Sequence, residues 1–301
     1  DAEMLIQLLN RALHSLNAEE MDVLEREWFG ESEPEPILPM QALLTQEERN
    51  YLAHKGKLRI CVDPNWMPYE QINPQGVWEG MSTDYFALFT ERLGMQFVLH
   101  PTQTWQETLE AAQQRRCDLI SLAAETQDRR AYLNFTQPYL IFPYVIATTR
   151  DTLIIEDIGK ELDKTYAVIK GYVVGEALRR KYPGIRLLEV RDIREGLLRV
   201  SSGDVAGYVD ASAAIGYALQ RDALPELKIA GVIPIDFELA TATRNDEPLL
   251  HSIMQKSVAQ LGDKERQQIV NQWIAVRFEQ GINYTIIWQL FAISCCFIII
   301  I

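Results

Sequence analysis

The feature that most constrains how this chain folds is a repeated alternation of short β-rich runs with helical stretches. The first set of strand-like and helical segments lies at 58–63, 83–93, 96–100, 106–116 and 117–123. A second set with the same order lies at 165–170, 175–182, 186–190, 193–201 and 206–210. A strand–helix–strand order predicts a parallel sheet with crossover helices. We therefore expect an α/β protein with two lobes.

Two further segments, 143–148 and 235–242, are candidate crossings between the lobes. They divide the chain into lobe 1, at about 57–143 and 241–281, and lobe 2, at about 148–235. Ligands of open α/β sheets bind beyond the carboxyl ends of the strands, and the space between domains is a favoured binding position. The sequence therefore predicts a binding site between the lobes.

Charge and composition argue against several classes of function. The chain has 29 Lys and Arg residues against 42 Asp and Glu residues, a formal charge of −13. Nucleic-acid-binding proteins normally carry a basic face, so no nucleic-acid partner is expected. The four His and four Cys residues lack zinc-ligand spacing. Because P-loop, GxSxG and HExxH motifs are also lacking, we expect no metal site, no cofactor and no catalytic machinery in this chain.

The C-terminal segment, residues 284–301, is apolar apart from Thr285, Gln289 and Ser294. A bilayer span needs about 20 such residues, and Tyr284 and Trp288 lie where interfacial aromatic residues are common. We interpret 284–301 as the start of a transmembrane helix, with a buried core helix as the alternative. The chain before it is then expected to lie outside the cytoplasm.

The two helical ends of the chain are similar to each other. Residues 4–28 align without a gap on 249–273, with identities at Leu5/Leu250, Leu16/Leu261, Glu20/Glu265 and Trp28/Trp273. The alternative explanation is that any two amphipathic helix pairs share apolar spacing. We interpret 1–30 as the C-terminal helices of a preceding module and 31–44 as a Pro-rich, acidic linker. Residues 45–281 would then form one complete module.

Five motifs follow one another within this module: Asp63-Pro-Asn-Trp-Met-Pro-Tyr69, Gly76-Val-Trp-Glu-Gly80, Thr126-Gln-Asp-Arg129, Asn134-Phe-Thr-Gln-Pro-Tyr139 and Lys170-Gly-Tyr172. Together they resemble the family 3 bacterial solute-binding proteins, which are amino-acid-type periplasmic binding proteins. The resemblance covers about 58–273. It implies a two-lobed periplasmic-binding-protein type II fold, the Venus flytrap, which closes on a small molecule.

Tandem copies followed by a membrane span resemble the periplasmic sensor regions of hybrid virulence-type histidine kinases. This resemblance implies a ligand-sensing domain in the periplasm, anchored in the bacterial inner membrane, within a homodimeric receptor. Its partners would be a carboxylate or amino acid, the preceding module and the membrane. The alternatives are the solute-binding component of an amino-acid transporter, the sensor of a cyclic-di-GMP enzyme, and a cell-wall lyase on the same scaffold.

The sharpest candidate for ligand contact is Arg129. In the family, the arginine of a Thr-x-Glu-Arg motif clamps the carboxylate of the ligand, and a planar guanidinium offers paired donors for that role. The alternative is a surface arginine paired with Asp128. Thr126, in the same motif, would either hydrogen-bond the ligand or cap the following helix.

Aromatic residues are the next candidates. Trp66 and Tyr69 follow the first strand and would either stack on the ligand or fill the core of lobe 1. Trp105 begins a helix and would likewise either stack on the ligand or fill the core. In lobe 2, the backbone amides near Gly171 and Tyr172 are expected to face a carboxylate from a helix start, with the Tyr172 ring as an aromatic contact.

The chain departs from the family pattern at the acid that binds the ligand's amine. That acid would fall at Ala211, whereas this chain has Asp210, one residue early. Because side chains alternate along a strand, Asp210 is expected to point away from the cleft unless a bulge shifts it. The ligand is therefore either amino-acid-like or a carboxylate without an amine.

Two cysteines, Cys61 and Cys117, lie on or beside strands that are candidate neighbours. Either a disulfide or two buried free thiols fits this placement.

Overall fold

The computed structural model describes residues 39–274. The chain divides into two compact units, 1–43 and 44–301, and of the first unit the structure describes only the end, with helix α3 (Met40–Leu43). The expected helices of a preceding module at 1–30 and the expected membrane span at 284–301 lie outside the described residues. Within 39–274, none of the helices is both long enough and apolar enough to span a bilayer.

Lobe 1 is built on three parallel strands, as the first alternating set predicts. Strands β1 (Lys57–Cys61), β5 (Gln96–Leu99) and β6 (Leu119–Ala123) lie in the order β6-β1-β5. Helix α5 (Met81–Leu93) packs against β5 and β6, and α6 (Trp105–Gln113) packs against β1. The buried face of α5 includes Met81, Tyr85, Phe86 and Phe89, at the three- and four-residue spacing of an amphipathic helix.

The sequence did not predict the small antiparallel sheet between β1 and α5. Its strands are β2 (Asn65–Trp66), β3 (Glu70–Ile72) and β4 (Trp78–Glu79). These strands have two or three residues each, too short for an alternating pattern to be recognised. They hold the loop that carries Asp63 and Trp66 over the carboxyl end of β1.

Lobe 2 follows the second alternating set. Strands β9 (Thr165–Ile169), β10 (Arg186–Val190) and β11 (Gly207–Ala211) lie in the order β10-β9-β11, and all pairs among them are parallel. The helices are α8 (Val173–Lys181), α9 (Ile193–Ser201) and the unpredicted α10 (Ser212–Arg221), with a short 3₁₀ turn, η1 (Ile158–Lys160), before β9.

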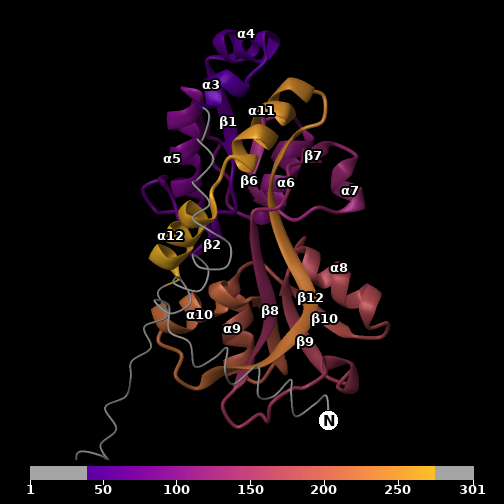
Figure 1. Ribbon diagram of the computed structural model, residues 1–301. Coiled ribbons are helices and arrows are strands. Elements are labelled where there is room, and N and C mark those ends of the chain that lie inside the picture. The colour runs from indigo at the N-terminus through magenta and orange to yellow at the C-terminus, as the bar shows by residue number, and fades with distance from the viewer. Residues whose placement is uncertain (1–38, 275–301) are drawn as a thin grey trace, which may run out of the picture. The chain divides into compact units, whose positions relative to one another are not determined.

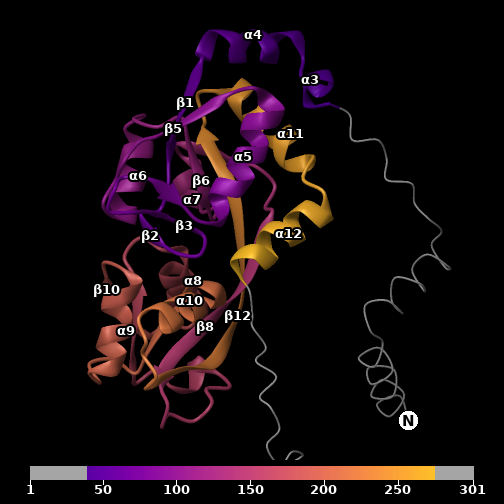
Figure 2. The ribbon, with the colours of Figure 1, turned by 90° about the vertical axis from the view of Figure 1, so that its left-hand side faces the viewer.

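Two long antiparallel strands join the lobes (Figures 1 and 2). They are β8 (Leu140–Thr149) and β12 (Leu227–Arg244), and both predicted crossings fall inside them. The β8–β12 pairing extends to Leu140 and Leu239, after which β12 pairs with β6 and with β7 (Leu133–Phe135) of lobe 1. Each strand thus belongs to both lobes, so this pair is the hinge.

Three helices complete lobe 1: α4 (Gln46–Lys55), α11 (Pro248–Ala259) and α12 (Asp263–Trp273). The chain breaks between α11 and α12 at 260–262. Thr45 and Glu48 form a capping box at the start of α4, and the carboxylate of Glu48 also accepts hydrogen bonds from Ser252 and Lys256 of α11. These contacts hold α4 on α11.

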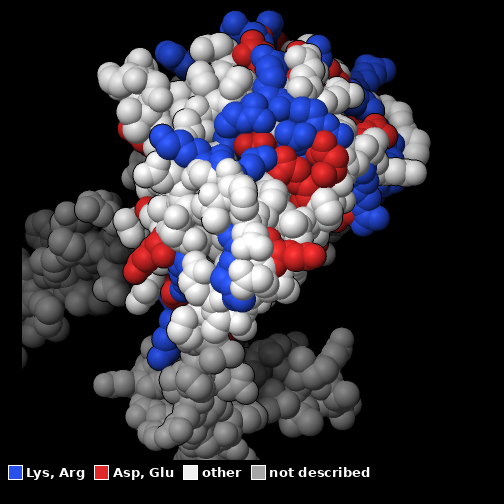
Figure 3. All heavy atoms as spheres, turned by 90° about the horizontal axis from the view of Figure 1, so that it is seen from above, with Lys and Arg blue, Asp and Glu red and all other residues white. Residues whose placement is uncertain are grey.

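Charged residues gather on the face of lobe 1 seen in Figure 3. The buried carboxylate of Asp118 pairs with Lys55, Arg59 and Arg244 at 3.0–3.5 Å. The cations come from α4, β1 and β12, so this one buried acid ties three elements together at the end of lobe 1 away from the hinge.

The structure resolves the alternatives for Cys61 and Cys117, which form a disulfide. Cys61 ends β1, and Cys117 lies two residues before β6. Disulfides persist in oxidising compartments such as the bacterial periplasm. The bond fixes the end of β1 immediately before the loop that carries Asp63.

Candidate functional site

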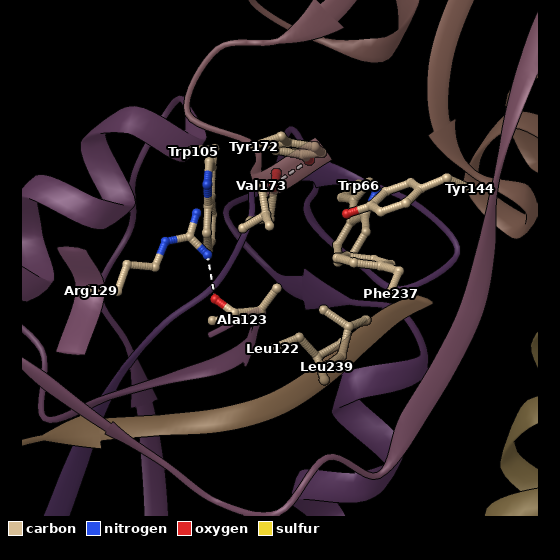
Figure 4. Close-up of a pocket in the computed structure, with 12 residues that line it drawn as sticks. Trp66, Trp105, Leu122, Ala123, Arg129, Tyr144, Tyr172, Val173, Phe237 and Leu239 are labelled. Carbon is tan, nitrogen blue, oxygen red and sulfur yellow. Dashed lines mark hydrogen bonds between the residues drawn. The ribbon is translucent and has the colours of Figure 1, made fainter. Parts of the chain in front are cut away.

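A small cavity lies between the lobes, next to the hinge (Figure 4). Its lining combines lobe 1, lobe 2 and the hinge strands: Asp63, Trp66, Trp105, Leu122, Ala123, Ala124, Arg129, Tyr144, Tyr172, Val173, Phe237 and Leu239. The space available to the centre of a water molecule is about 20 Å³, and one water needs roughly 10–15 Å³ by that measure. At this cavity the cleft is therefore closed, with room for about one water.

Arg129 lies in the wall of this cavity and is 6% exposed. It belongs to α7 (Gln127–Arg130), and its guanidinium donates to the carbonyl oxygens of Ala124 (2.7 Å) and Gly171 (2.9 Å). Its guanidinium carbon also lies 5.3 Å from the centre of the Trp105 ring, within range of a cation–π contact. The contact with Gly171 joins lobe 1 to lobe 2.

No carboxylate of the described residues forms an ion pair with Arg129. Burial lowers the pKa of this guanidinium, but arginine stays protonated in proteins. A buried charge normally has an opposite charge beside it. The site therefore offers a cation whose present partners are neutral carbonyl groups, and it is suited chemically to bind an anion.

The carbonyl oxygen of Gly171 accepts two hydrogen bonds from lobe 1. It accepts from Arg129 and also from the indole Nε1 of Trp105 (3.2 Å). The sequence predicted that backbone amides near Gly171 would face a carboxylate. In the closed cleft the Gly171 carbonyl faces the guanidinium instead, and the amide of Tyr172 donates to Ile169 (3.1 Å) within a turn.

A second interlobe contact joins Tyr172 of lobe 2 to Asp63 of lobe 1. The Tyr172 hydroxyl donates to Asp63 Oδ2 (2.5 Å), and the amide of Asn65 donates to Asp63 Oδ1 (3.0 Å). Asp63 therefore orders its own loop, lies in the wall of the cavity and forms a hydrogen bond across the cleft.

Asp210 forms the third contact, and its direction differs from the expectation. Its side chain is fully buried and accepts from Trp66 Nε1 of lobe 1 (3.3 Å), from Tyr208 (2.5 Å) and from the amide of Ala211 (2.7 Å). The pairing of β11 with β8 is regular from Tyr208 to Ala211, so no bulge is involved. Asp210 shares its face of β11 with Tyr208 and points at lobe 1.

Buried acids make the site sensitive to protons. Burial raises the pKa of Asp63 to about 6, even though Tyr172 donates to it. Burial, with the charge of Asp63, raises the pKa of Asp210 to about 7. Behind Asp63, burial raises the pKa of Glu70 to about 8; Glu70 accepts from the Asp63 amide (2.8 Å) and from Ser121.

Four predicted site residues do not line the cavity: Gly171 and Asp210, whose contacts are given above, and Thr126 and Tyr69. Thr126 caps α7, with its hydroxyl accepting from the Arg129 amide (3.2 Å). The ring of Tyr69 packs against Trp66 (4.3 Å between ring centres) and Phe142 (5.0 Å). Its hydroxyl is one of two among the described side chains that are buried without a hydrogen-bond partner, and burial, together with the nearby charge of Asp210, raises its pKa.

Sequence reasoning missed the apolar part of the lining. Tyr144, Phe237 and Leu239 come from the hinge strands, and Trp66 packs edge-on against Phe237 (5.6 Å) and Tyr172 (5.7 Å). Tyr144 and Phe237 lie inside the two predicted crossings, so a search of those crossings for aromatic residues would have found them. Within residues 39–274 there is no cluster of His, Cys, Asp and Glu that could hold a metal ion.

Comparison with known proteins assigns the family. The bacterial extracellular solute-binding proteins, family 3, match residues 58–276. The chain belongs to this family. Its two lobes, the hinge of two long strands and the closed interlobe cleft are the features of a Venus flytrap.

Two of the proteins that the chain resembles in sequence are sensor proteins. The chain is similar to the virulence sensor protein BvgS of Bordetella bronchiseptica, with 22% identity over 274 residues, 91% of this chain and 22% of the relative. It is also similar to the sensor protein EvgS of Escherichia coli, with 21% identity over 280 residues, 91% of this chain and 23% of the relative. The chain thus spans about a fifth of the length of these curated relatives.

The fold is shared with a solved structure, the periplasmic VFT2 domain of BvgS from Bordetella pertussis. The TM-score is 0.71 at 22% identity, and the match covers 76% of this chain and 98% of that domain.

Proposed function

We propose that this chain is the periplasmic sensor module of a membrane-bound histidine kinase. It binds a small carboxylate between its lobes and signals through movement about the β8–β12 hinge. The observation that carries this proposal is Arg129, a buried guanidinium in the interlobe cavity that is held by two carbonyl groups and has no carboxylate partner among the described residues.

The carboxylate of the ligand takes the place of the Gly171 carbonyl. That carbonyl now accepts from Arg129 and Trp105, and an ionised oxygen accepts such bonds about twice as strongly as a neutral one. Because the closed cavity has room for about one water, binding has to separate Gly171 from Arg129. The ligand thereby acts on a contact that holds the lobes together.

The ligand needs no amine. Both oxygens of Asp63 and both oxygens of Asp210 already accept hydrogen bonds from the protein. Among the described residues that line the cavity, the charge without an opposite charge beside it is that of Arg129, and most of the remaining lining is apolar or aromatic. These features favour a compact, apolar monocarboxylate over a zwitterionic amino acid.

The wider architecture belongs to the same proposal. Residues 45–281 form one flytrap module, 1–30 are the last helices of a preceding module, 31–44 link the two, and 284–301 begin a span of the bacterial inner membrane. The internal repeat, the apolar C-terminal segment and the similarity to BvgS and EvgS support this arrangement. The full-length receptor would be a homodimeric kinase, and this chain would contribute ligand binding alone.

Thermal unfolding of the 301-residue chain with a panel of small carboxylates and amino acids tests the proposal. A ligand at a hundredfold its Kd adds about 2.7 kcal/mol, which raises the Tm of a domain of this size by roughly 5–10 °C. We expect such a shift with apolar carboxylates and its loss in Arg129→Ala. A panel without any shift contradicts ligand sensing, and a shift that survives Arg129→Ala contradicts the site.

The second candidate function is the solute-binding component of an amino-acid transporter. It is favoured if zwitterionic amino acids give the largest shifts in the same panel. The apolar segment at 284–301 argues against it, because such components are free or carry a lipid anchor.

A further inference from the structure

A second hollow of the molecule lies where the end of α12 faces lobe 2. This groove has a volume of about 660 Å³ and combines Trp273 and Ile274 of lobe 1 with Ala213, Gly216 and Tyr217 of α10 and with Ile229 of β12. Pro68 and Phe142 also line it. In both ribbon views the end of α12 approaches α10 (Figures 1 and 2). The groove is distinct from the ligand cavity, with which it shares no residue.

One wall of the groove is fixed to lobe 1. The indole Nε1 of Trp273 donates to Asp84 of α5 (2.6 Å). Glu265, near the start of α12, pairs with Arg92, which also belongs to α5. Helix α12 therefore moves with lobe 1. The opposite wall, α10, belongs to lobe 2, so a change in the angle between the lobes changes the width of this groove.

The chain leaves α12 at the mouth of the groove. Ile274, the last described residue, has departed from helical backbone, with φ −109° and ψ 55°, and its side chain already lines the groove. Residues 275–279 read Ala-Val-Arg-Phe-Glu. In an extended chain alternate side chains share a face, so an extended conformation would place Val276 and Phe278 on the face of Ile274 and Arg277 on the other.

We propose that residues 275–279 of this chain dock in the groove between α12 and α10, with Val276 and Phe278 against α10. The segment is continuous with the groove wall, and five residues reach about 17 Å when extended. Of the α10 residues that line the groove, Ala213 and Gly216 are small and leave space for an apolar partner. An exposed apolar groove of this kind is a typical docking surface.

This docking places lobe 2 in direct contact with the segment that leads toward residue 284. Without it, lobe 1 alone would position the exit of the chain, through α12. If the module signals by hinge movement, as proposed above, then the groove is where that movement reaches the outgoing chain. The docking itself depends on neither the ligand nor Arg129, so its test is independent of the proposed function.

Gly216 offers a sharp test because a side chain added there meets no atom within 4 Å. Gly216→Trp fills the groove, whereas Gly216→Ala adds one methyl group and serves as the matched control. Hydrogen–deuterium exchange of the 301-residue chain is measured on peptides that cover 275–280. We expect slowed exchange in the wild type and in Gly216→Ala, and exchange about tenfold faster in Gly216→Trp. Equal exchange in all three, or an unprotected wild type, overturns the proposal.

A second measurement holds even if the tryptophan variant fails to fold. Gly216→Cys is labelled with a maleimide in a chain whose Cys295 and Cys296 are changed to serine, with and without Phe278→Asp. We expect labelling to be about tenfold faster when Phe278→Asp is present. An unchanged rate overturns the proposal, and protection that disappears on dilution overturns it in favour of a second copy of the chain as the occupant.

Discussion

Glu70 provides a quantitative test of how the site is built, because its carboxyl group is fully buried behind the loop that carries Asp63. Burial raises its pKa to about 8 from an ordinary value of 4.5. Glutamine has the shape of the protonated acid and keeps an acceptor for the Asp63 amide. Its NH₂ group donates to Ser121, whose hydroxyl then accepts instead of donating. Glu70→Gln therefore removes the titration and preserves the contacts.

The raised pKa determines whether stability rises or falls with pH. The folded protein holds the Glu70 proton more tightly than the unfolded chain does, so the wild type loses stability as pH rises from about 4.5 to about 8. The full difference in pKa corresponds to about 5 kcal/mol as an upper value, with a slope of about 1.4 kcal/mol per pH unit. Glu70→Gln has no carboxyl group to titrate at this position, so it does not lose this stability as pH rises. Its free energy of unfolding is expected to match the wild type near pH 4.5 and to exceed it by about 3 kcal/mol at pH 7.

Urea unfolding of both proteins at pH 5, 6, 7 and 8, followed by circular dichroism, measures this difference. Asp63 and Asp210 also make the free energy of unfolding depend on pH. They are present in both proteins, so their contributions cancel in the difference between the two. The exposed Glu110→Gln serves as a control and is expected to change the free energy of unfolding by no more than about 0.5 kcal/mol. A Glu70→Gln difference that stays constant with pH would refute the assignment of a buried, protonated acid behind the Asp63 loop.

Three further predictions concern contacts that hold the cleft and its scaffold. Tyr172→Phe leaves Asp63 without its interlobe donor, so we expect amide exchange at the lobe interface to quicken about tenfold or more; unchanged exchange contradicts this. Replacing Cys61 and Cys117 by serine opens a long loop and is expected to lower the free energy of unfolding by about 4 kcal/mol in urea, whereas an unchanged value contradicts a native disulfide. Gly80→Ala puts a Cβ 2.6 Å from backbone atoms at a φ of +120°, so its Tm should fall sharply, and a wild-type Tm would contradict that packing.

The larger part of the fold was predictable because it rests on local patterns. The ranges 186–190 and 193–201 coincide with β10 and α9, since each is set by apolar periodicity and a clear boundary. Helix α10 was missed because Ser212 to Arg221 follows β11 without a turn and contains Gly216. The β2–β4 sheet was missed because its strands are held by pairing with one another rather than by their own pattern.

The candidate site was predictable in its residues and less so in its geometry. Trp66, Trp105, Arg129 and Tyr172 all line the cavity, because motif positions specify where a side chain starts. Motifs do not specify what it meets across the hinge. That Gly171 presents a carbonyl to Arg129, and that Asp210 faces Trp66, depends on the angle between two lobes whose contacts are far apart in sequence.

The central claim is that the Arg129 guanidinium pairs with the carboxylate of a ligand in the interlobe cavity. Isothermal titration tests it with the best-binding carboxylate of the panel and its uncharged primary amide, each against the wild type and Arg129→Gln. The amide has the shape of the acid but no charge, so the four Kd values isolate the charge pair.

We expect the wild type to prefer the acid over the amide by about 3 kcal/mol, roughly 150-fold in Kd, because losing one partner leaves the other charge buried and unpaired. In Arg129→Gln the preference should fall to near zero. If acid and amide bind the wild type equally, or if the preference persists in Arg129→Gln, then Arg129 is not the anion anchor and the account of this site is wrong.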